Sequence, residues 1–270
     1  MSTASARSSL TAAACAVLAA AEPAEKVSRT REAAAAWRSG RITGIGDARP
    51  PDRPARPDRP VLLPPQAMPK RKSGRSPRHR IALLHALAHI EFNAVDLAWD
   101  IIARFAYEDL PSAFYDDWVT IAEEEALHFR LLSDRLAELG AGYGDLPAHD
   151  GLWQAAGETA HDLLARLAVV PLVLEARGLD VTPGTIANLE QAGDSESAAL
   201  LRRIYEDEIG HVAAGRRWFE YVCARLGLEP IASWQALVRR HFRGSLKPPF
   251  NVDARAAAGF DAAYYRPLAG

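Results

Sequence analysis

The sequence predicts an all-α protein whose main part is a four-helix bundle. Three observations support this fold class. Strand signals are almost absent from residue 81 onward, apolar residues recur there at spacings of three and four, and glycine and proline residues divide the region into four long segments. With 270 residues, of which 49% are hydrophobic, the chain can bury a substantial core. We therefore expect a folded chain rather than a disordered one.

The first part of the chain differs in composition from the rest. We expect residues 1–46 to form an alanine-rich helical segment that ends near Ser39 and Gly40. Residues 47–79 are expected to be a connector, because its proline-rich run DARPPDRPARPDRPVLLPPQAMP can form neither a helix nor a central strand. Its last residues belong to the basic stretch PKRKSGRSPRHR.

Four long helices are expected within a bundle that spans residues 80–227. Their predicted ranges are 80–106, 112–139, 152–177 and 195–226. Pro111 follows the first, a group of glycines from Gly140 follows the second, and Gly178 follows the third. Asp194 or Ser195 is the expected N-cap of the fourth helix, and Gly227 is its expected end.

Two shorter elements complete the prediction. A helix is expected at 184–192, where TPG precedes it and AGD follows it. Residues 228–270 are expected to pack on the bundle as a helix at about 231–243 and an irregular tail that contains KPPFN.

Acidic and imidazole side chains interrupt the apolar stripe of each long helix. The first and third stripes each contain one carboxylate, and the second and fourth each contain the pattern Glu-x-x-His. The interrupting residues are Glu91, Glu175, Glu125 with His128, and Glu208 with His211. A glutamate and a histidine three positions apart lie on the same face of a helix, with about 5–6 Å between their Cβ atoms.

The spacing of these residues repeats along the chain. Glu91 and Glu125 are 34 residues apart and Glu175 and Glu208 are 33 apart, while the two Glu-x-x-His patterns are separated by 83 residues. This repeat predicts a helix hairpin used twice about a pseudo-two-fold axis. Four carboxylates and two imidazoles would then meet in the middle of the bundle.

Buried carboxylates cost several kcal/mol each unless they are protonated, paired or bound to a metal. No lysine or arginine lies on these stripes, so two divalent cations are the expected counter-charges. A glutamate from each of two helices and Glu-x-x-His from each of the other two is the ligand set of known di-iron and di-manganese bundles. Mixed oxygen and nitrogen ligands suit iron or manganese. Iron is the expected metal, with manganese or a mixed pair as alternatives. A single Glu-x-x-His is common on solvated helices, so the prediction rests on the matched pair.

Several segments resemble a known family. LLHALAHIE (83–91), EEEALHF (123–129), EARGLDVTPG (175–184), YEDEIGHV (205–212) and KPPFN with the following AR and AGF (247–260) resemble the ferritin-like superfamily, and more narrowly the family named domain of unknown function 455. The resemblance covers nearly the whole chain and implies a ferritin-like bundle without implying a substrate. A more remote resemblance in fold is to the bacterial tRNA hydroxylase that acts on a modified adenosine.

Four further residues are candidates for supporting the ligands. Metal-bound imidazoles usually donate their second nitrogen to a carboxylate. Pseudo-symmetry would direct Asp207 toward His128 and Glu124 toward His211, although solvated side chains are an equal alternative. His85 and His89 precede Glu91 and are expected beside the stripe, as supporting or helix-packing residues rather than ligands.

Three residues near the third and fourth stripes affect the backbone or the packing of these helices. Pro171 precedes Glu175 by four residues and is expected to remove a helical hydrogen bond there. Gly210 and Gly215 leave space on the fourth helix, which either admits dioxygen or substrate or allows close helix packing.

The ligand set favours an oxygen-dependent oxidase or hydroxylase of unknown substrate, which would also need an electron donor. Three alternatives remain: iron storage or ferroxidase activity, manganese catalase-like disproportionation of peroxide, and a non-enzymatic bundle that the metals only stabilise. The sequence leaves the catalytic residues beyond the metal site, the oligomeric state and the native metal open.

Charge and composition limit the partners and the compartment. The formal charge of −2 indicates no global attraction to nucleic acid, so a tRNA substrate would depend on the local group Lys70, Arg71, Lys72, Arg75, Arg78 and Arg80. No window contains the roughly 20 apolar residues of a membrane span. Cys15 and Cys223 have no CxxC spacing and are expected to be buried thiols, which favours the cytoplasm. The run LTAAACAVLAAAEP (10–23) after Arg7 is compatible with a signal peptide, but an amphipathic helix is the favoured interpretation.

Overall fold

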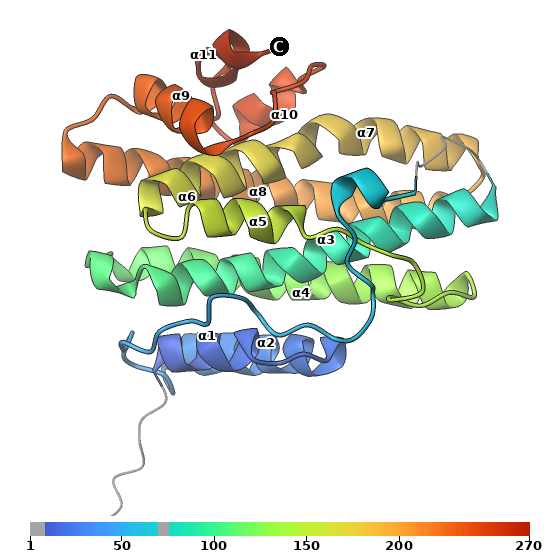
Figure 1. The fold of residues 1–270 in the computed structure, drawn as a ribbon, viewed down its shortest axis with the longest axis horizontal. Helices are drawn as coiled ribbons and strands as arrows, with labels where there is room; N and C mark the ends of the chain where they lie inside the picture. The colour runs from blue at the N-terminus through green and yellow to red at the C-terminus, as the bar shows by residue number, and fades with distance from the viewer. Residues whose placement is uncertain (1–8, 70–75) are drawn as a thin grey trace, which may run out of the picture. The chain divides into compact units, whose positions relative to one another are not determined.

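The structure is a computed structural model that describes residues 9–69 and 76–270. Within these residues the protein is helical and contains no strand, which confirms the all-α prediction (Figure 1). Two isolated β-bridges, Leu62 to Ala148 and Leu246 to Ala269, are the β-type pairings in the described ranges. The chain divides into two compact units, residues 1–68 with 84–149 and residues 69–83 with 150–270.

The first unit is built from the N-terminal helices and the first two long helices. Its elements are α1 (Leu10–Leu18), α2 (Pro23–Arg38), the 3₁₀ turns η1 (Pro65–Ala67) and η2 (Ala106–Glu108), α3 (Pro77–Arg104) from residue 84 onward, and α4 (Ser112–Glu138). Helix α2 contacts both α1 and α4. Large apolar side chains such as Phe92, Trp99 and Trp118 are buried in this core. The helices expected at 80–106 and 112–139 are therefore confirmed, with ends within three residues of α3 and α4.

The proline-rich connector runs across this unit in an extended conformation, as its composition predicts. The Ala55 amide donates to the Leu18 carbonyl over 2.8 Å, and the Leu63 amide donates to the Ala148 carbonyl over 2.8 Å. These bonds attach the middle part of the connector at two points. Of the basic group expected to follow it, Lys70, Arg71, Lys72 and Arg75 lie outside the described residues.

The second unit contains the remaining helices. They are α5 (Gly151–Glu158), α6 (Leu163–Val169), the π-helix η3 (Val170–Glu175), α7 (Ala176–Gln191), α8 (Ser195–Leu226), α9 (Pro230–His241), α10 (Val252–Ala257), α11 (Ala262–Tyr265) and η4 (Arg266–Leu268). The series α6, η3 and α7 packs along α8, and α9 packs on α6, α8 and α11. Helix α8 has the predicted range of 195–226, with the Asp194 carboxylate accepting from the Ser197 amide and with Gly227 at φ 66°.

The predicted third helix is wrong in its extent. Instead of one helix over 152–177, α5 ends at Glu158 and a new helix begins where the Asp162 carboxylate accepts hydrogen bonds from two backbone amides. Gly178 does not end it, since this glycine does not adopt the positive φ of a helix C-terminus. The separate helix expected at 184–192 is the last part of α7, which contains Pro183.

The C-terminal tail is less irregular than predicted. The Asn251 side chain accepts a hydrogen bond from the Ala254 amide and caps α10, and Asp261 caps α11 in the same way. Both are N-cap residues of the preferred type, but the helices that they begin are too short to show a clear apolar period.

Helix α3 is long and apolar enough to cross a membrane by length and composition alone, but 67% of the apolar window is buried within the protein. A buried window of this kind is what the core helix of a soluble protein shows. Cys15 and Cys223 are free thiols; Cys223 is buried as predicted, whereas Cys15 is only partly buried.

Candidate metal centre

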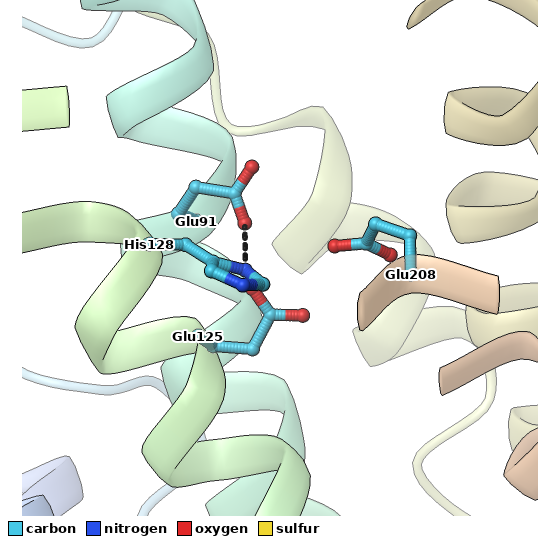
Figure 2. Close-up of side chains that lie close together, drawn as sticks. All are labelled: Glu91, Glu125, His128 and Glu208. Atoms are coloured by element: carbon cyan, nitrogen blue, oxygen red, sulfur yellow. Dashed lines mark ion pairs between the residues drawn. The ribbon is translucent and has the colours of Figure 1, made fainter. Parts of the chain in front are cut away.

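Three predicted ligands meet in the first unit, where α3 passes α4. Glu91, Glu125 and His128 each offer one ligand atom, and these atoms lie within 4.8 Å of one another (Figure 2). The His128 Nδ1 atom is 3.5 Å from Glu125 Oε2 and 3.8 Å from Glu91 Oε2. All three side chains are buried, so two carboxylates and one imidazole share a site with little access to water. This cluster could hold a metal ion.

The electrostatics of this cluster favour a positive charge at its centre. Burial by itself lowers the pKa of His128, but the nearby carboxylates of Glu125 and Glu91 outweigh it and raise the pKa to about 11. In the metal-free protein the imidazole is therefore protonated at neutral pH. The two acids thus create a place for a cation, which a divalent metal ion would fill after displacing the proton.

The second unit carries the matching pair on α8. The His211 Nδ1 atom is 3.6 Å from Glu208 Oε2, and His211 is buried while Glu208 is half-buried. Figure 2 draws Glu208 on its helix. Glu175 is the last residue of η3, which packs against α8, and it is also half-buried.

The geometry of the two Glu-x-x-His pairs suits metal chelation. Two ligand atoms that each lie about 2.1 Å from one ion are separated by about 3.0–3.5 Å. The 3.5 Å and 3.6 Å separations in the two pairs are close to this value. A carboxylate and an imidazole at this distance can bind one ion with little movement of either side chain, so the residues present fit a metal.

The π-helix gives Glu175 its position. Pro171 has no amide hydrogen to donate, and the backbone around it forms the wider π turn rather than the break that proline often causes. The Pro171 ring lies against Gly215 of α8, where any Cβ atom would clash with it. Gly215 is therefore required for close packing, whereas Gly210 has open space around it.

His85 and His89 contact a different part of the unit from Glu91. At 3.6 residues per turn, His89 points about 160° away from Glu91. His85 Nε2 accepts hydrogen bonds from the Gly144 amide at 3.0 Å and the Leu146 amide at 3.4 Å. His89 lies 2.9 Å from the Tyr143 hydroxyl and 3.2 Å from the His149 carbonyl. These two histidines thus hold the 143–149 loop against α3.

The protonation state of His89 follows from its partners. Burial, with a further contribution from Arg56, lowers the pKa of His89 to about 4, so the ring is neutral at pH 7. The neutral ring carries one hydrogen, and its Nε2 atom lies between the His149 carbonyl, which only accepts, and the Asn93 side-chain amide nitrogen, which only donates, at 3.2 Å and 3.1 Å.

The two carboxylates expected to support the imidazoles are half-buried. Glu124 lies on α4 in the first unit and Asp207 lies on α8 in the second. Each was expected to reach a histidine of the other unit, and this pairing stays a prediction.

A buried charge network on α3 escaped the sequence analysis. Asp96 is fully buried and forms ion pairs with Lys26, over 2.5 Å, and with Arg56. The second guanidinium nitrogen of Arg56 donates to the Asn93 side chain over 2.7 Å. An aspartate inside an apolar helix was a signal that a partner was needed. The partners themselves lie 70 and 40 residues away, so no local pattern could identify them.

Comparison with known proteins places the chain in a family. No solved structure matches it. An uncharacterized protein of Haemophilus influenzae is 42% identical over 209 residues, which cover 76% of this chain and 72% of the relative. The profile of the family described as "Protein of unknown function (DUF455)" matches residues 19–266. Because this match spans nearly the entire chain, including every predicted metal ligand, the protein belongs to the DUF455 family.

Proposed function

We propose that this protein is a ferritin-like dinuclear metal protein that catalyses an oxygen-dependent oxidation or hydroxylation. In this proposal each unit holds one metal ion. One ion is held by Glu91, Glu125 and His128, and the other by Glu175, Glu208 and His211. Iron is the proposed native metal, with manganese or a mixed pair as the alternatives.

The equivalence of the two Glu-x-x-His pairs carries this proposal. Each pair lies on a long helix, each imidazole is buried, and each Nδ1 atom is 3.5–3.6 Å from the carboxylate three residues earlier. The pairs are 83 residues apart in the sequence. A duplicated pair of this kind is expected when two equivalent halves bind two equivalent ions, and it has no evident use in packing alone.

Charge balance supports two ions rather than one. Four ligand carboxylates carry a charge of −4, which two divalent cations neutralise. In the first unit alone, the cluster of two acids already raises the pKa of His128 to about 11, which reflects a strong local demand for positive charge. The four helices that carry the ligands would form the ferritin-like bundle, and cytoplasmic location is part of the same proposal.

The exposure of the ligands favours a reactive site over a purely structural one. Glu91 and Glu125 are buried, whereas Glu175 and Glu208 are half-buried. Structural metal sites are usually closed, while catalytic sites keep a position open for substrate. The half-buried carboxylates of the second unit are therefore the proposed side of entry for dioxygen or substrate.

The chemistry would be divided between the metal and the chain. A pair of ferrous ions with an open coordination position supplies two electrons for the reduction of dioxygen. The carboxylates and the buried imidazoles of α4 and α8 would hold the ions, and the apolar neighbours would keep water out. An external electron donor would restore the ferrous state after each cycle.

Metal analysis and oxygen uptake test the proposal. Protein purified from its own host should contain about two iron or manganese ions per chain, and the reduced form should consume dioxygen. Glu125→Ala and His211→Ala should each lower the metal content, whereas Glu123→Gln should not, because Glu123 pairs with Arg38 instead. A wild-type protein that binds no metal would refute the proposal, and one that binds two ions but is inert to oxygen and to peroxide would have a structural site instead.

A further inference from the structure

The C-terminal segment of residues 247–265, which we name the C-terminal clamp, is attached to α7 and α8 beside two proposed ligands. Arg255 and Asp180 form its central ion pair. Arg255 Nε donates to Asp180 Oδ1 over 2.9 Å and Nη2 donates to Oδ2 over 2.8 Å, so the pair is bidentate. Both side chains are buried. A bidentate pair fixes direction as well as distance, and the clamp is therefore held rigidly on α7.

The same arginine contacts the backbone next to Glu175. Arg255 Nη2 donates to the carbonyl of Ala176, the residue that follows Glu175, over 3.3 Å. Three aromatic rings surround the guanidinium group, at centroid distances of 5.1 Å for Phe250, 5.5 Å for Phe260 and 4.4 Å for Tyr265. These rings remove water from the arginine, which strengthens its hydrogen bonds.

Asn251 links α7 to α8. Its side-chain nitrogen, Nδ2, donates to the Leu179 carbonyl over 3.1 Å and to the Tyr205 hydroxyl over 2.8 Å. Tyr205 lies three residues before Glu208, on the preceding turn of α8. One side chain of the clamp therefore connects the helix that follows Glu175 with the helix that carries Glu208.

The bond to Leu179 repairs a defect in α7. In a regular helix the Leu179 carbonyl accepts from the amide four residues later, but that residue is Pro183, which has no amide hydrogen. Asn251 supplies the missing donor. The proline thus leaves an acceptor in α7 to which the clamp donates, and this contact helps the helix to tolerate a proline.

Glu175 needs such external support because of the π-helix before it. Residues 170–175 form a wider turn than an α-helix, and the turn contains Pro171. Such turns are less regular than an α-helix, so the direction of the Glu175 side chain depends on what holds the backbone after it. The first turn of α7, residues 176–180, is the part that Arg255 and Asn251 bind.

We infer that the C-terminal clamp positions Glu175 and Glu208 for metal binding, with Arg255, Asp180 and Asn251 as positioning residues. This inference rests on the proposed function and adds to it the residues that hold two of the ligands in position. Within the described residues, the hydrogen bonds of Arg255 and Asn251 given above go to α7 and α8 of the second unit, so loss of the clamp should affect the ion assigned to Glu175, Glu208 and His211. The ion assigned to Glu91, Glu125 and His128 should be retained.

Two variants test the role of the clamp. Arg255→Lys keeps the charge but loses the bidentate geometry, and Tyr205→Phe removes a single hydroxyl that accepts from Asn251. Arg243→Lys is the matched control, since Arg243 lies close to the same segment but pairs only with Glu158 and is 86% exposed. Replacing groups that orient metal ligands typically costs 10–100-fold in affinity. We expect Arg255→Lys to lower the affinity for one of the two bound Co²⁺ ions about tenfold or more. Tyr205→Phe should lower the affinity for the same ion to a smaller extent.

The measurements separate positioning from general stability. Co²⁺ titration of the full chain, followed by visible absorption, reports both the number of ions and the geometry of each, and circular dichroism shows whether the variant is folded. A folded Arg255→Lys protein that binds both equivalents as the wild type does, with an unchanged spectrum, would overturn the inference. Equal weakening of both equivalents would also overturn it. If Arg255→Lys does not fold, Tyr205→Phe decides by the same criteria.

Hydrogen exchange of the metal-free protein distinguishes failure of the inference from failure of the proposed function. Amides 172–178 and 205–211 should exchange faster in Arg255→Lys than in Arg243→Lys. If the wild type binds no Co²⁺, Fe²⁺ or Mn²⁺ but this exchange pattern appears, the proposed metal function fails while the mechanical role of the clamp stands. If the wild type binds two ions and neither exchange nor affinity changes in the variant, only the clamp inference fails.

Discussion

Gly215 of α8 lies directly against Pro171 of the π-helix. A methyl group at Gly215 would be 2.3 Å from the Pro171 Cβ atom and 2.6 Å from its Cγ atom, both closer than real Cβ contacts allow. The proline ring cannot move away by rotating a side chain. The contact therefore sets how closely η3 approaches α8, four residues before Glu175 on one helix and four residues after His211 on the other.

Gly215→Ala should destabilise the protein by about 1–3 kcal/mol, which is the usual cost of an extra methylene in a packed interior. Gly210→Ala is the control, because Gly210 is exposed and has nothing within 4 Å of the added methyl group. There the higher helix propensity of alanine should stabilise the protein by up to about 1 kcal/mol. Chemical denaturation of the two variants measures the difference. Equal free energies of unfolding for Gly215→Ala and Gly210→Ala would contradict the close contact between Gly215 and Pro171.

The ion pairs of Asp96 predict an asymmetry between two substitutions. Asp96→Asn leaves the buried Lys26 ammonium without its counter-charge, which typically costs about 3–5 kcal/mol. Lys26→Met should cost less, since Asp96 keeps its ion pair with Arg56. Urea denaturation of the two variants measures both costs. A larger loss from Lys26→Met than from Asp96→Asn would show that Arg56 does not support Asp96.

Metal binding by the first unit should depend on pH. The pKa of His128 is raised to about 11 in the metal-free protein, so at neutral pH an incoming ion must displace a proton from it. For each unit that the pH falls below this value, the proton competes better and the apparent affinity should drop about tenfold. Mn²⁺ titrations between pH 6 and 8 measure this slope. His128→Gln should lower the affinity and flatten its dependence on pH, and a wild-type affinity that does not change with pH would contradict the prediction.

The buried thiol of Cys223 should make the protein less stable at alkaline pH. Burial, followed by the charges of Glu220 and Glu229, raises the pKa of this thiol to about 11 from its ordinary value near 9. Between these two values the folded state binds more protons than the unfolded state, so stability falls as the pH rises from about 9 to about 11. Thermal denaturation at pH 8 to 11 should show a steeper decline for the wild type than for Cys223→Ala. Parallel declines would show that the thiol titrates normally.

Reactivity toward a thiol reagent gives a simpler check of the same environment. Cys15 is partly exposed and Cys223 is buried, so at pH 8 the native protein should label at Cys15 first. Fast labelling of both thiols would indicate that the C-terminal part of α8 opens readily.

Local patterns accounted for the ligand-bearing helices well. The range of α8 and its Asp194 cap were predicted from apolar spacing and from residues within a few positions of the helix ends. Glu125 with His128 and Glu208 with His211 were paired on the same reasoning, since residues three apart on a helix must be neighbours. The third helix was predicted less well, because Gly178 and Pro183 look like helix ends when their surroundings are unknown.

The amino-acid sequence by itself determined that the chain is helical, which residues share a helix face, and that carboxylates and imidazoles recur at matched positions, because helix geometry makes these properties local. Only the tertiary structure decided that Lys26 and Arg56 neutralise Asp96, that Gly215 accommodates Pro171, and that Arg255 and Asn251 hold α7. These contacts join residues 40 to 79 positions apart. Their formation depends on how whole helices pack, and no periodicity in the sequence records that arrangement.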